Sequence, residues 1–232
     1  MDKDSFIDFM VKSGVIKFGN FKTKSGRMSP YFINMGLYST GSQMRQLGRF
    51  YAGFINELIS SSKLPDSNFT IFGPAYKGIP LAVATSIALM RDFGIDISWC
   101  FNRKEKKDHG EGGNMVGCEL KDGDSVLIVD DVLTAGTAVR ESLTILREQA
   151  DLKISGVIVA VDRMERGRNG EKSALKEISN EFNVDVFPIV NIKEIVDSLY
   201  DRNANGRPLI DPEVKASIDA YLKEYGTYHK TS

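Results

Sequence analysis

The chain has 232 residues, of which 42% are hydrophobic and 26% are charged, and its formal net charge is −1. This length allows one domain with a substantial core, and the balanced charge gives no general reason to expect nucleic acid or an acidic membrane as a partner. Any anion-binding site must therefore be local.

Two features indicate a cytoplasmic protein. The chain has only two cysteines, Cys100 and Cys118, and neither lies in a metal-ligand or CxxC spacing, which favours reduced thiols over a disulfide. The N-terminal MDKDSFIDFMVKSG lacks the basic start and long apolar run of a signal peptide, and no apolar stretch is long enough to span a bilayer.

Hydrophobic periodicity and turn residues predict an α/β protein. The first part is expected to hold a helix over 4–13, a short hairpin within 15–36 and a helix over 42–59. Strands are then predicted at 69–72, 95–101, 125–129, 154–161 and 184–190, helices between them at 79–90, 135–149 and 173–182, and closing helices at 192–200 and 212–225. Alternating strands and helices predict a mostly parallel sheet flanked by helices, in a single domain covering 1–232.

Ligands of such sheets bind beyond the carboxyl ends of the strands. That position is occupied by three segments, GPAYKG (73–78), DDVLTAGTA (130–138) and DRMERGR (162–168). We expect all three to face one crevice.

The segment DDVLTAGTA combines two acids with a loop of small and hydroxylated residues at the start of a helix. The loop 133–137 offers backbone N–H groups and hydroxyls suited to a phosphate monoester. Asp130 and Asp131 can accept hydrogen bonds from sugar hydroxyls, directly or through a magnesium ion. The simpler alternative is that Asp131 or Thr134 only caps the helix. The chain has no GxxxxGK[ST] motif and no GxGxxG after a strand, which argues against a nucleotide triphosphatase or a dinucleotide enzyme.

A basic, glycine-rich segment, FNRKEKKDHGEGGNMVG, covers 101–117. Such a stretch can simply be a solvated loop. Beside a phosphate site, however, cations on a glycine-hinged loop could close over a leaving pyrophosphate and exclude water.

The segment VLIVDDVLTAGTA resembles the phosphoribosyl-pyrophosphate (PRPP) binding signature of type I phosphoribosyltransferases. The basic loop and TKSGRMSPYFINMG (23–36) further resemble the orotate phosphoribosyltransferases, over about residues 5–225. This resemblance implies transfer of ribose 5-phosphate from PRPP to orotate, giving orotidine 5′-monophosphate and pyrophosphate in the synthesis of UMP. It also implies a hood over the active site, formed by residues 1–40 and part of the C-terminus, and a homodimer whose subunits share the loop 103–113.

The resemblance also assigns site residues. It implies PRPP contacts from Lys24, Tyr76, Lys77, Arg103, Lys104, Lys107, His109, Asp130, Asp131, Val132, Leu133, Thr134, Ala135, Gly136, Thr137 and Ala138. It implies orotate contacts from Phe32, Ile33, Thr134 and Arg163, and catalytic roles for Lys107, His109 and Asp131. The implied cofactor is Mg²⁺, held mainly by PRPP oxygens and reached from Asp130 or Asp131 through water.

Some of these assignments have alternatives. Ile33 departs from the family, which often has a second aromatic residue there, and Lys106 adds a charge at a variable loop position. Arg163 could instead form a surface ion pair, with Arg166 and Arg168 as nearby substitutes, and Phe32 could belong to the core.

Two rival functions remain open. One is a phosphoribosyltransferase for uracil or a purine, which the two discriminating motifs disfavour. The other is a PRPP-binding regulator without catalysis, but we find no helix-turn-helix or basic stripe for nucleic acid. With nearly all of the length assigned to one fold, we expect no fused decarboxylase domain.

Overall fold

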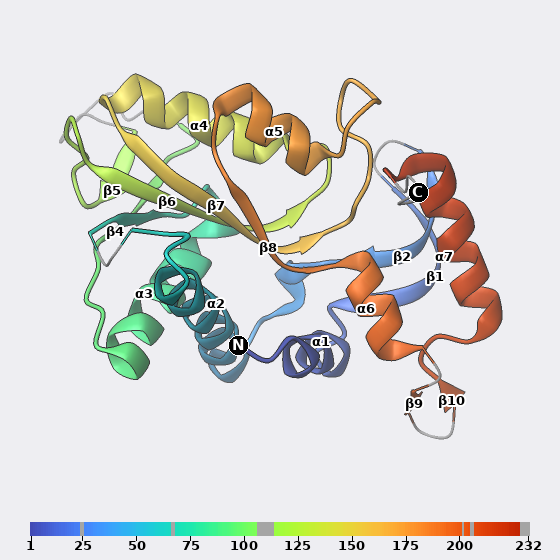
Figure 1. The fold of residues 1–232 in the computed structure, drawn as a ribbon. Helices are drawn as coiled ribbons and strands as arrows, with labels where there is room; N and C mark the ends of the chain where they lie inside the picture. The colour runs from blue at the N-terminus through green and yellow to red at the C-terminus, as the bar shows by residue number, and fades with distance from the viewer. Residues whose placement is uncertain (24–25, 66–67, 106–113, 201, 205–206, 228–232) are drawn as a thin grey trace.

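The fold is built on a six-stranded sheet with helices on both faces (Figure 1). A computed structural model describes residues 1–23, 26–65, 68–105, 114–200, 202–204 and 207–227. The strand order is β5-β4-β3-β6-β7-β8, with every pairing parallel except that of β4 with β5. The six strands are β3 (Thr70–Phe72), β4 (Trp99–Asn102), β5 (Met115–Gly117), β6 (Ser125–Leu133), β7 (Lys153–Asp162) and β8 (Val186–Asn191). The predicted fold class is therefore confirmed.

Alternation along the strands divides the core between the two faces. On one face, Val126 and Ile128 of β6 pack with residues of α4 (Thr137–Gln149) and α5 (Ala174–Phe182). On the other, Leu127 and Val129 belong to the cluster that includes α2 (Gly41–Ser60) and α3 (Gly78–Phe93). Successive side chains of a strand point to opposite faces, so both apolar faces of β6 are covered, as expected for a central parallel strand.

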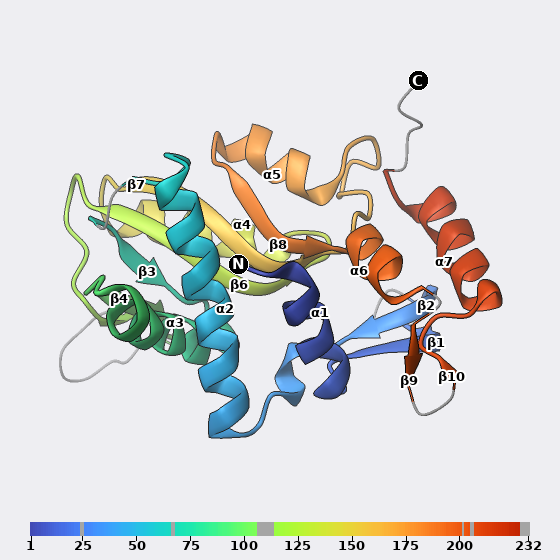
Figure 2. The same ribbon diagram turned by 60° about the horizontal axis from the view of Figure 1, so that its bottom comes forward.

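Segments from the two halves of the chain, α1 with the β1–β2 hairpin and α6 with α7, lie together beside the sheet (Figure 2). The N-terminal part comprises α1 (Lys3–Lys12) and an antiparallel hairpin of β1 (Ile16–Lys22) and β2 (Met28–Ile33), followed by a 3₁₀ turn, Met35–Leu37. The C-terminal part comprises α6 (Ile192–Leu199), a small β9–β10 hairpin (Asn203–Ala204 and Arg207–Pro208) and α7 (Pro212–Tyr225). Helix α7 packs on β2, with the Tyr31 and Tyr221 rings edge to face at 5.8 Å.

Several predicted boundaries were wrong. The strand predicted over 95–101 begins only at Trp99, and the short strands β5, β9 and β10 were not predicted. Strand β6 continues to Leu133, so Asp130 and Asp131 lie within the strand, because the pairing with β7 extends to Leu133 and Asp162. Helix α4 correspondingly begins at Thr137 rather than at 135.

No helix in the described part of the chain is both long and apolar enough to cross a membrane.

Candidate active site

The two acids of β6 have different environments. The Asp130 carboxylate is buried, and its Oδ1 accepts a hydrogen bond from the backbone N–H of Asp131 at 2.8 Å. The Asp131 carboxylate accepts from the Val132 N–H at 2.7 Å through Oδ1, while Oδ2 lies 2.6 Å from Nζ of Lys77. The hydroxyl of Tyr51 on α2 donates to the Asp130 carbonyl at 2.7 Å and so ties this part of the strand to that helix.

The pKa of the Asp130 carboxyl is raised to about 7, mainly by burial and secondly by the neighbouring charge of Asp131. The backbone N–H of Asp131 and the ammonium group of Lys77 act in the opposite direction. Asp130 is thus a carboxyl group poised to change its charge near neutral pH, which is a frequent property of functional sites.

The segment GPAYKG forms a tight turn between β3 and α3. A Cβ on Gly73 would lie 2.1 Å from the carbonyl oxygen of Gly78, so only glycine allows the turn to close on itself. The peptide bond between Ala75 and Tyr76 is cis, and the Ala75 N–H donates to Oδ1 of the buried Asn102 at 3.0 Å. Tyr76 is 71% exposed, and Lys77 reaches from this turn to Asp131.

The loop 133–138 connects β6 with α4 and presents the helix N-terminus. Gly136 is the N-cap residue and has φ +73°, and no side chain in the described contacts caps this helix. The alternative in which Asp131 or Thr134 only caps the helix is therefore wrong. The N-terminus of α4 therefore has no side-chain cap, and N–H groups at an uncapped helix N-terminus can bind phosphate. The Thr137 hydroxyl accepts a hydrogen bond from Nη2 of Arg168 at 2.9 Å.

An arginine that the sequence reasoning missed supports this loop. The buried Arg140 donates from Nη1 to the Ala135 carbonyl at 2.6 Å and pairs with Glu177 and Glu181 of α5. Glu177 also accepts from the backbone N–H groups of Arg168 and Asn169. Arg140 occupies an ordinary helical position, so only its burial reveals its role.

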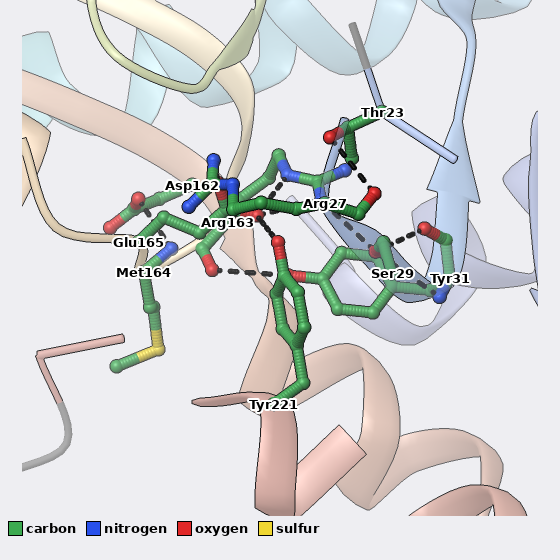
Figure 3. Close-up of polar contacts among 9 residues, drawn as sticks. All are labelled: Thr23, Arg27, Ser29, Tyr31, Asp162, Arg163, Met164, Glu165 and Tyr221. Atoms are coloured by element: carbon green, nitrogen blue, oxygen red, sulfur yellow. Dashed lines mark hydrogen bonds and ion pairs between the residues drawn. The ribbon is translucent and has the colours of Figure 1, made fainter. Parts of the chain in front are cut away.

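Arg163 lies at the end of β7, where it is held by a buried polar network (Figure 3). Its Nε donates to Oε1 of Glu165 at 2.7 Å, and its Nη2 lies 2.6 Å from the same oxygen. The Tyr31 ring lies under the guanidinium group at 4.5 Å. Arg163 therefore does form an ion pair, but a buried one, contrary to the surface alternative.

One cavity of about 1000 Å³ brings most of the predicted site together. Its lining includes Phe32, Ile33, Tyr76, Lys77, Lys104, Asp130, Asp131, Val132, Leu133, Thr134, Gly136, Thr137, Ala138 and Arg163. Arg103 lines a neighbouring cavity of about 590 Å³, together with Lys104, Thr137 and Arg168. Ala135 contributes its carbonyl to Arg140 instead. The predicted residues Lys24, Lys107 and His109, and the extra Lys106, lie outside the described residues.

Phe32 is 41% exposed and stacks on Phe21 with ring centroids 5.5 Å apart. It is therefore not an ordinary core residue. Its ring forms part of the cavity wall on the side of the N-terminal hairpin.

A fully protein-bound metal does not fit this site. In the described ranges, no three His, Cys, Asp or Glu side chains come together as metal ligands. Asp130 and Asp131 supply only two carboxylates, which suits a Mg²⁺ ion that keeps most of its oxygen ligands from a substrate and water.

The family model described as a phosphoribosyl transferase domain matches residues 41–190. An orotate phosphoribosyltransferase of Clostridium beijerinckii is 53% identical over 224 residues, covering 97% of each chain, and one of Bifidobacterium adolescentis is 50% identical over 222 residues, covering 95% of this chain and 96% of its own. The crystal structure of orotate phosphoribosyltransferase of Francisella tularensis is 38% identical with a TM-score of 0.78, covering 96% of this chain and 100% of its own.

Proposed function

The chain belongs to the orotate phosphoribosyltransferases, and from this membership we infer that its main crevice transfers ribose 5-phosphate from PRPP to N1 of orotate. The products are orotidine 5′-monophosphate and pyrophosphate, in the pathway to UMP. The observation that carries this assignment to the crevice is that one cavity combines a phosphate-binding loop, an acid pair and a buried arginine.

We propose that the donor lies along the loop 133–138 and the acid pair. Its 5′-phosphate would be bound by the N–H groups at the start of α4 and by the hydroxyls of Thr134 and Thr137. Asp130 and Asp131 would accept hydrogen bonds from the ribose hydroxyls. Val132, Leu133, Ala135, Gly136 and Ala138 would contribute backbone rather than side-chain contacts.

The pyrophosphate would then extend toward the turn after β3. Lys77 lies there with Tyr76, and Lys104 lines the same cavity. Arg103 lines the adjoining cavity and completes a positively charged wall. We assign Lys24, Lys107 and His109 to the same charge neutralisation from their sequence motifs.

Orotate is a planar pyrimidine with a carboxylate, and the other end of the cavity has suitable partners. Arg163 would bind the carboxylate, and the exposed ring of Phe32 would cover one face of the base. Ile33 and Thr134 would line the remaining edge. Ile33 cannot stack as an aromatic residue does, so stacking falls to Phe32 alone.

The bond between C1′ and the pyrophosphate oxygen is expected to break ahead of formation of the bond from C1′ to N1. The electron pair of the broken bond leaves with pyrophosphate, and positive charge develops at C1′. Asp131 would orient the ribose, and the cationic side chains would stabilise the leaving group. Lys107 or His109 would supply a proton or positive charge to the pyrophosphate. Since N1 of orotate readily becomes anionic, little general-base catalysis is needed.

Mg²⁺ is the proposed cofactor. Bound mainly by pyrophosphate and ribose oxygens, it would neutralise charge on the leaving group, with Asp130 or Asp131 as water-mediated ligands.

The larger assembly is also a proposal. The chain is proposed to form a single domain in which residues 1–40 and part of the C-terminus act as a hood, because the β1–β2 hairpin and α7 adjoin the cavity end that holds Arg163. The homodimer that shares the loop 103–113 rests on the family resemblance. A cytoplasmic location is supported by the two free cysteines.

The decisive assay is the loss of orotate absorbance when PRPP is added with Mg²⁺. We expect turnover with orotate and none with uracil or hypoxanthine under the same conditions. Preferential use of either other base would contradict the proposed acceptor. Calorimetry with PRPP and Mg²⁺ distinguishes an enzyme from a regulator. A protein that binds PRPP but does not turn over orotate would be a regulator.

A further inference from the structure

Glu165 is the centre of the buried network around Arg163, and none of the assignments above gives it a role. Its Oε1 accepts from Arg163 Nε at 2.7 Å and from the Tyr221 hydroxyl at 2.9 Å. Its Oε2 lies 3.2 Å from Nη2 of Arg27. One carboxylate thus joins the end of β7, the N-terminal hairpin and helix α7 (Figure 3).

These contacts decide which part of the Arg163 guanidinium remains available. Nε and Nη2 are both engaged by Glu165, and Nη2 also donates to the Ser29 hydroxyl at 3.3 Å. Among the residues that the structure describes, none accepts a hydrogen bond from Nη1. Since Arg163 also lines the main cavity, Nη1 is the nitrogen it can offer to a ligand.

The backbone around Glu165 is held by the end of the C-terminal helix. Met164 adopts φ +54°, and its N–H donates to Oδ1 of Asp162 at 2.8 Å. The N–H of Arg166 donates to the Tyr225 carbonyl at 2.9 Å, and the Thr227 N–H donates to the Met164 carbonyl at 3.1 Å. The turn that carries Glu165 is therefore braced by residues distant in the chain.

We propose that Glu165 is a positioning residue for the orotate subsite. It fixes the Arg163 guanidinium in one orientation, and Tyr221 and Arg27 hold Glu165 in turn. Through this network the N-terminal hairpin and α7 determine how well the enzyme binds the substrate carboxylate. The inference rests on the proposed function, specifically on Arg163 as the carboxylate partner.

A purely structural role would have a different signature. Buried charged networks often stabilise little, yet loss of one partner leaves another charge unpaired. A role limited to stability would affect both substrates or neither. A positioning role would act on orotate alone, because the described side-chain partners of Glu165 are Arg163, Tyr221 and Arg27, and none of them lies on β6 or α4. Only the backbone N–H of Arg163, which Glu165→Gln leaves in place, reaches the Leu133 carbonyl, at 3.5 Å.

The test is steady-state kinetics of the variants Glu165→Gln and Tyr221→Phe. The KM for orotate is measured with PRPP saturating, and the KM for PRPP with orotate saturating. Glu165→Gln keeps the shape but removes the charge, and we expect the KM for orotate to rise about tenfold or more. The KM for PRPP should stay within about twofold. Tyr221→Phe removes only one hydrogen bond to Glu165, and we expect the orotate KM to rise about threefold. Because Tyr221→Phe retains the ring, it carries the test if Glu165→Gln does not fold.

Two controls match these changes on the same helix. Tyr225 is another tyrosine of α7, and its ring contacts that of Tyr221, whereas its hydroxyl makes no described hydrogen bond to Glu165. Asp219 pairs with Lys215 on the exposed side of α7. Tyr225→Phe and Asp219→Asn should leave both KM values unchanged.

The variant Arg163→Lys separates the role of Arg163 as the carboxylate partner from the positioning role of Glu165. If it raises the orotate KM but folded Glu165→Gln and Tyr221→Phe do not, the positioning role is refuted and the function stands. Parallel rises of both KM values would also refute positioning. If Arg163→Lys leaves the orotate KM unchanged, the carboxylate assignment and the positioning role both fail, while turnover of orotate by the unmodified enzyme still supports the function.

Discussion

Nζ of Lys77, in the turn after β3, lies 2.6 Å from Oδ2 of Asp131, near the carboxyl end of the neighbouring strand β6. The Lys77 side chain is half exposed, whereas the Asp131 side chain is mostly buried. In the absence of substrate, the Lys77 ammonium group and the Asp131 carboxylate therefore form an ion pair with each other. Binding of PRPP, as proposed, would replace this pair by contacts to ribose hydroxyls and pyrophosphate.

Asp131→Asn should therefore damage catalysis more than stability. Loss of a charged hydrogen bond to the donor is expected to lower kcat/KM for PRPP about 10- to 100-fold. The ion pair, whose Lys77 side is open to solvent, contributes about 1 kcal/mol, so the free energy of unfolding should change little. Kinetics and urea unfolding of the same preparation measure both effects.

Asp92→Asn is the matched control, because Asp92 is paired with Arg49 and Arg91 at the far end of α3. It should leave kcat/KM unchanged. Equal kinetic losses in the two variants would show that Asp131 has no specific part in donor binding.

Asp130 predicts an unusual pH dependence of stability. Its pKa is about 7 in the folded protein, above the ordinary value of 3.8. A carboxyl group with a raised folded pKa binds protons more tightly in the native state, so its contribution is complete below pH 3.8 and is lost as pH rises to 7. At about 1.4 kcal/mol per pKa unit, that loss is about 4 kcal/mol.

Asp130→Asn should remove this loss, since the amide oxygen can still accept from the Asp131 N–H. In the ligand-free protein, we expect wild type and variant to be equally stable near pH 4 and the variant to be more stable at pH 8. Urea unfolding at both pH values measures the difference. A difference that does not change with pH would mean that Asp130 titrates normally.

Gly136 makes the loop 133–138, the proposed phosphate-binding loop, sensitive to a single methyl group. Its φ of +73° disfavours any other residue, and a Cβ would lie 2.4 Å from Cδ1 of Ile178 and 3.0 Å from Nη1 of Arg140. Gly136→Ala should therefore shift the loop and weaken PRPP binding strongly, as calorimetry with Mg²⁺ present can show. Arg140, which holds the loop through the Ala135 carbonyl, would be displaced as well.

Gly94 provides the control, with φ +68° and, beyond its two chain neighbours, no described atom within 4 Å of the place that a Cβ would take. Gly94→Ala has the same backbone cost of about 1 kcal/mol without the collision, and PRPP affinity should be unchanged. Similar affinity in both variants would show that the loop tolerates the methyl group.

The sequence predicted the strand and loop around Asp130 and Asp131 better than it predicted the buried polar residues that hold the neighbouring segments in place. The apolar run before Asp130 and the small residues up to Ala138 are local signals, and they indicated both the strand and the loop that leads into α4. The strand end at Leu133 was missed because pairing with β7, a distant segment, overrides the local polarity.

Asn102, Arg140 and Glu165 were missed for a related reason. Each acts through a partner that the chain reaches only after folding: Ala75 for Asn102, Glu177 for Arg140, and Tyr221 for Glu165. Residue type and spacing carry no signal for such contacts. Burial of a charged or amide side chain is the property that identifies them.

The proposed sharing of the loop 103–113 between subunits can be tested by mixing two defective enzymes. Lys107→Ala damages the loop, and Asp131→Asn damages the crevice, so each homodimer should be nearly inactive. If each loop serves the neighbouring subunit, a hybrid dimer has one site with both defects and one site with neither. Random mixing in equal amounts should then restore about a quarter of wild-type turnover, since half of the dimers are hybrids with one intact site.

The hybrid must be verified, for example by differently tagged subunits, before turnover is measured. Mixing two preparations of Asp131→Asn controls for any effect of subunit exchange itself. If each loop instead serves its own subunit, every site in the hybrid has one defect, and turnover stays at the level of the parent variants. That result in a verified hybrid would rule out loop sharing, because C2 symmetry leaves no other arrangement of the two defects.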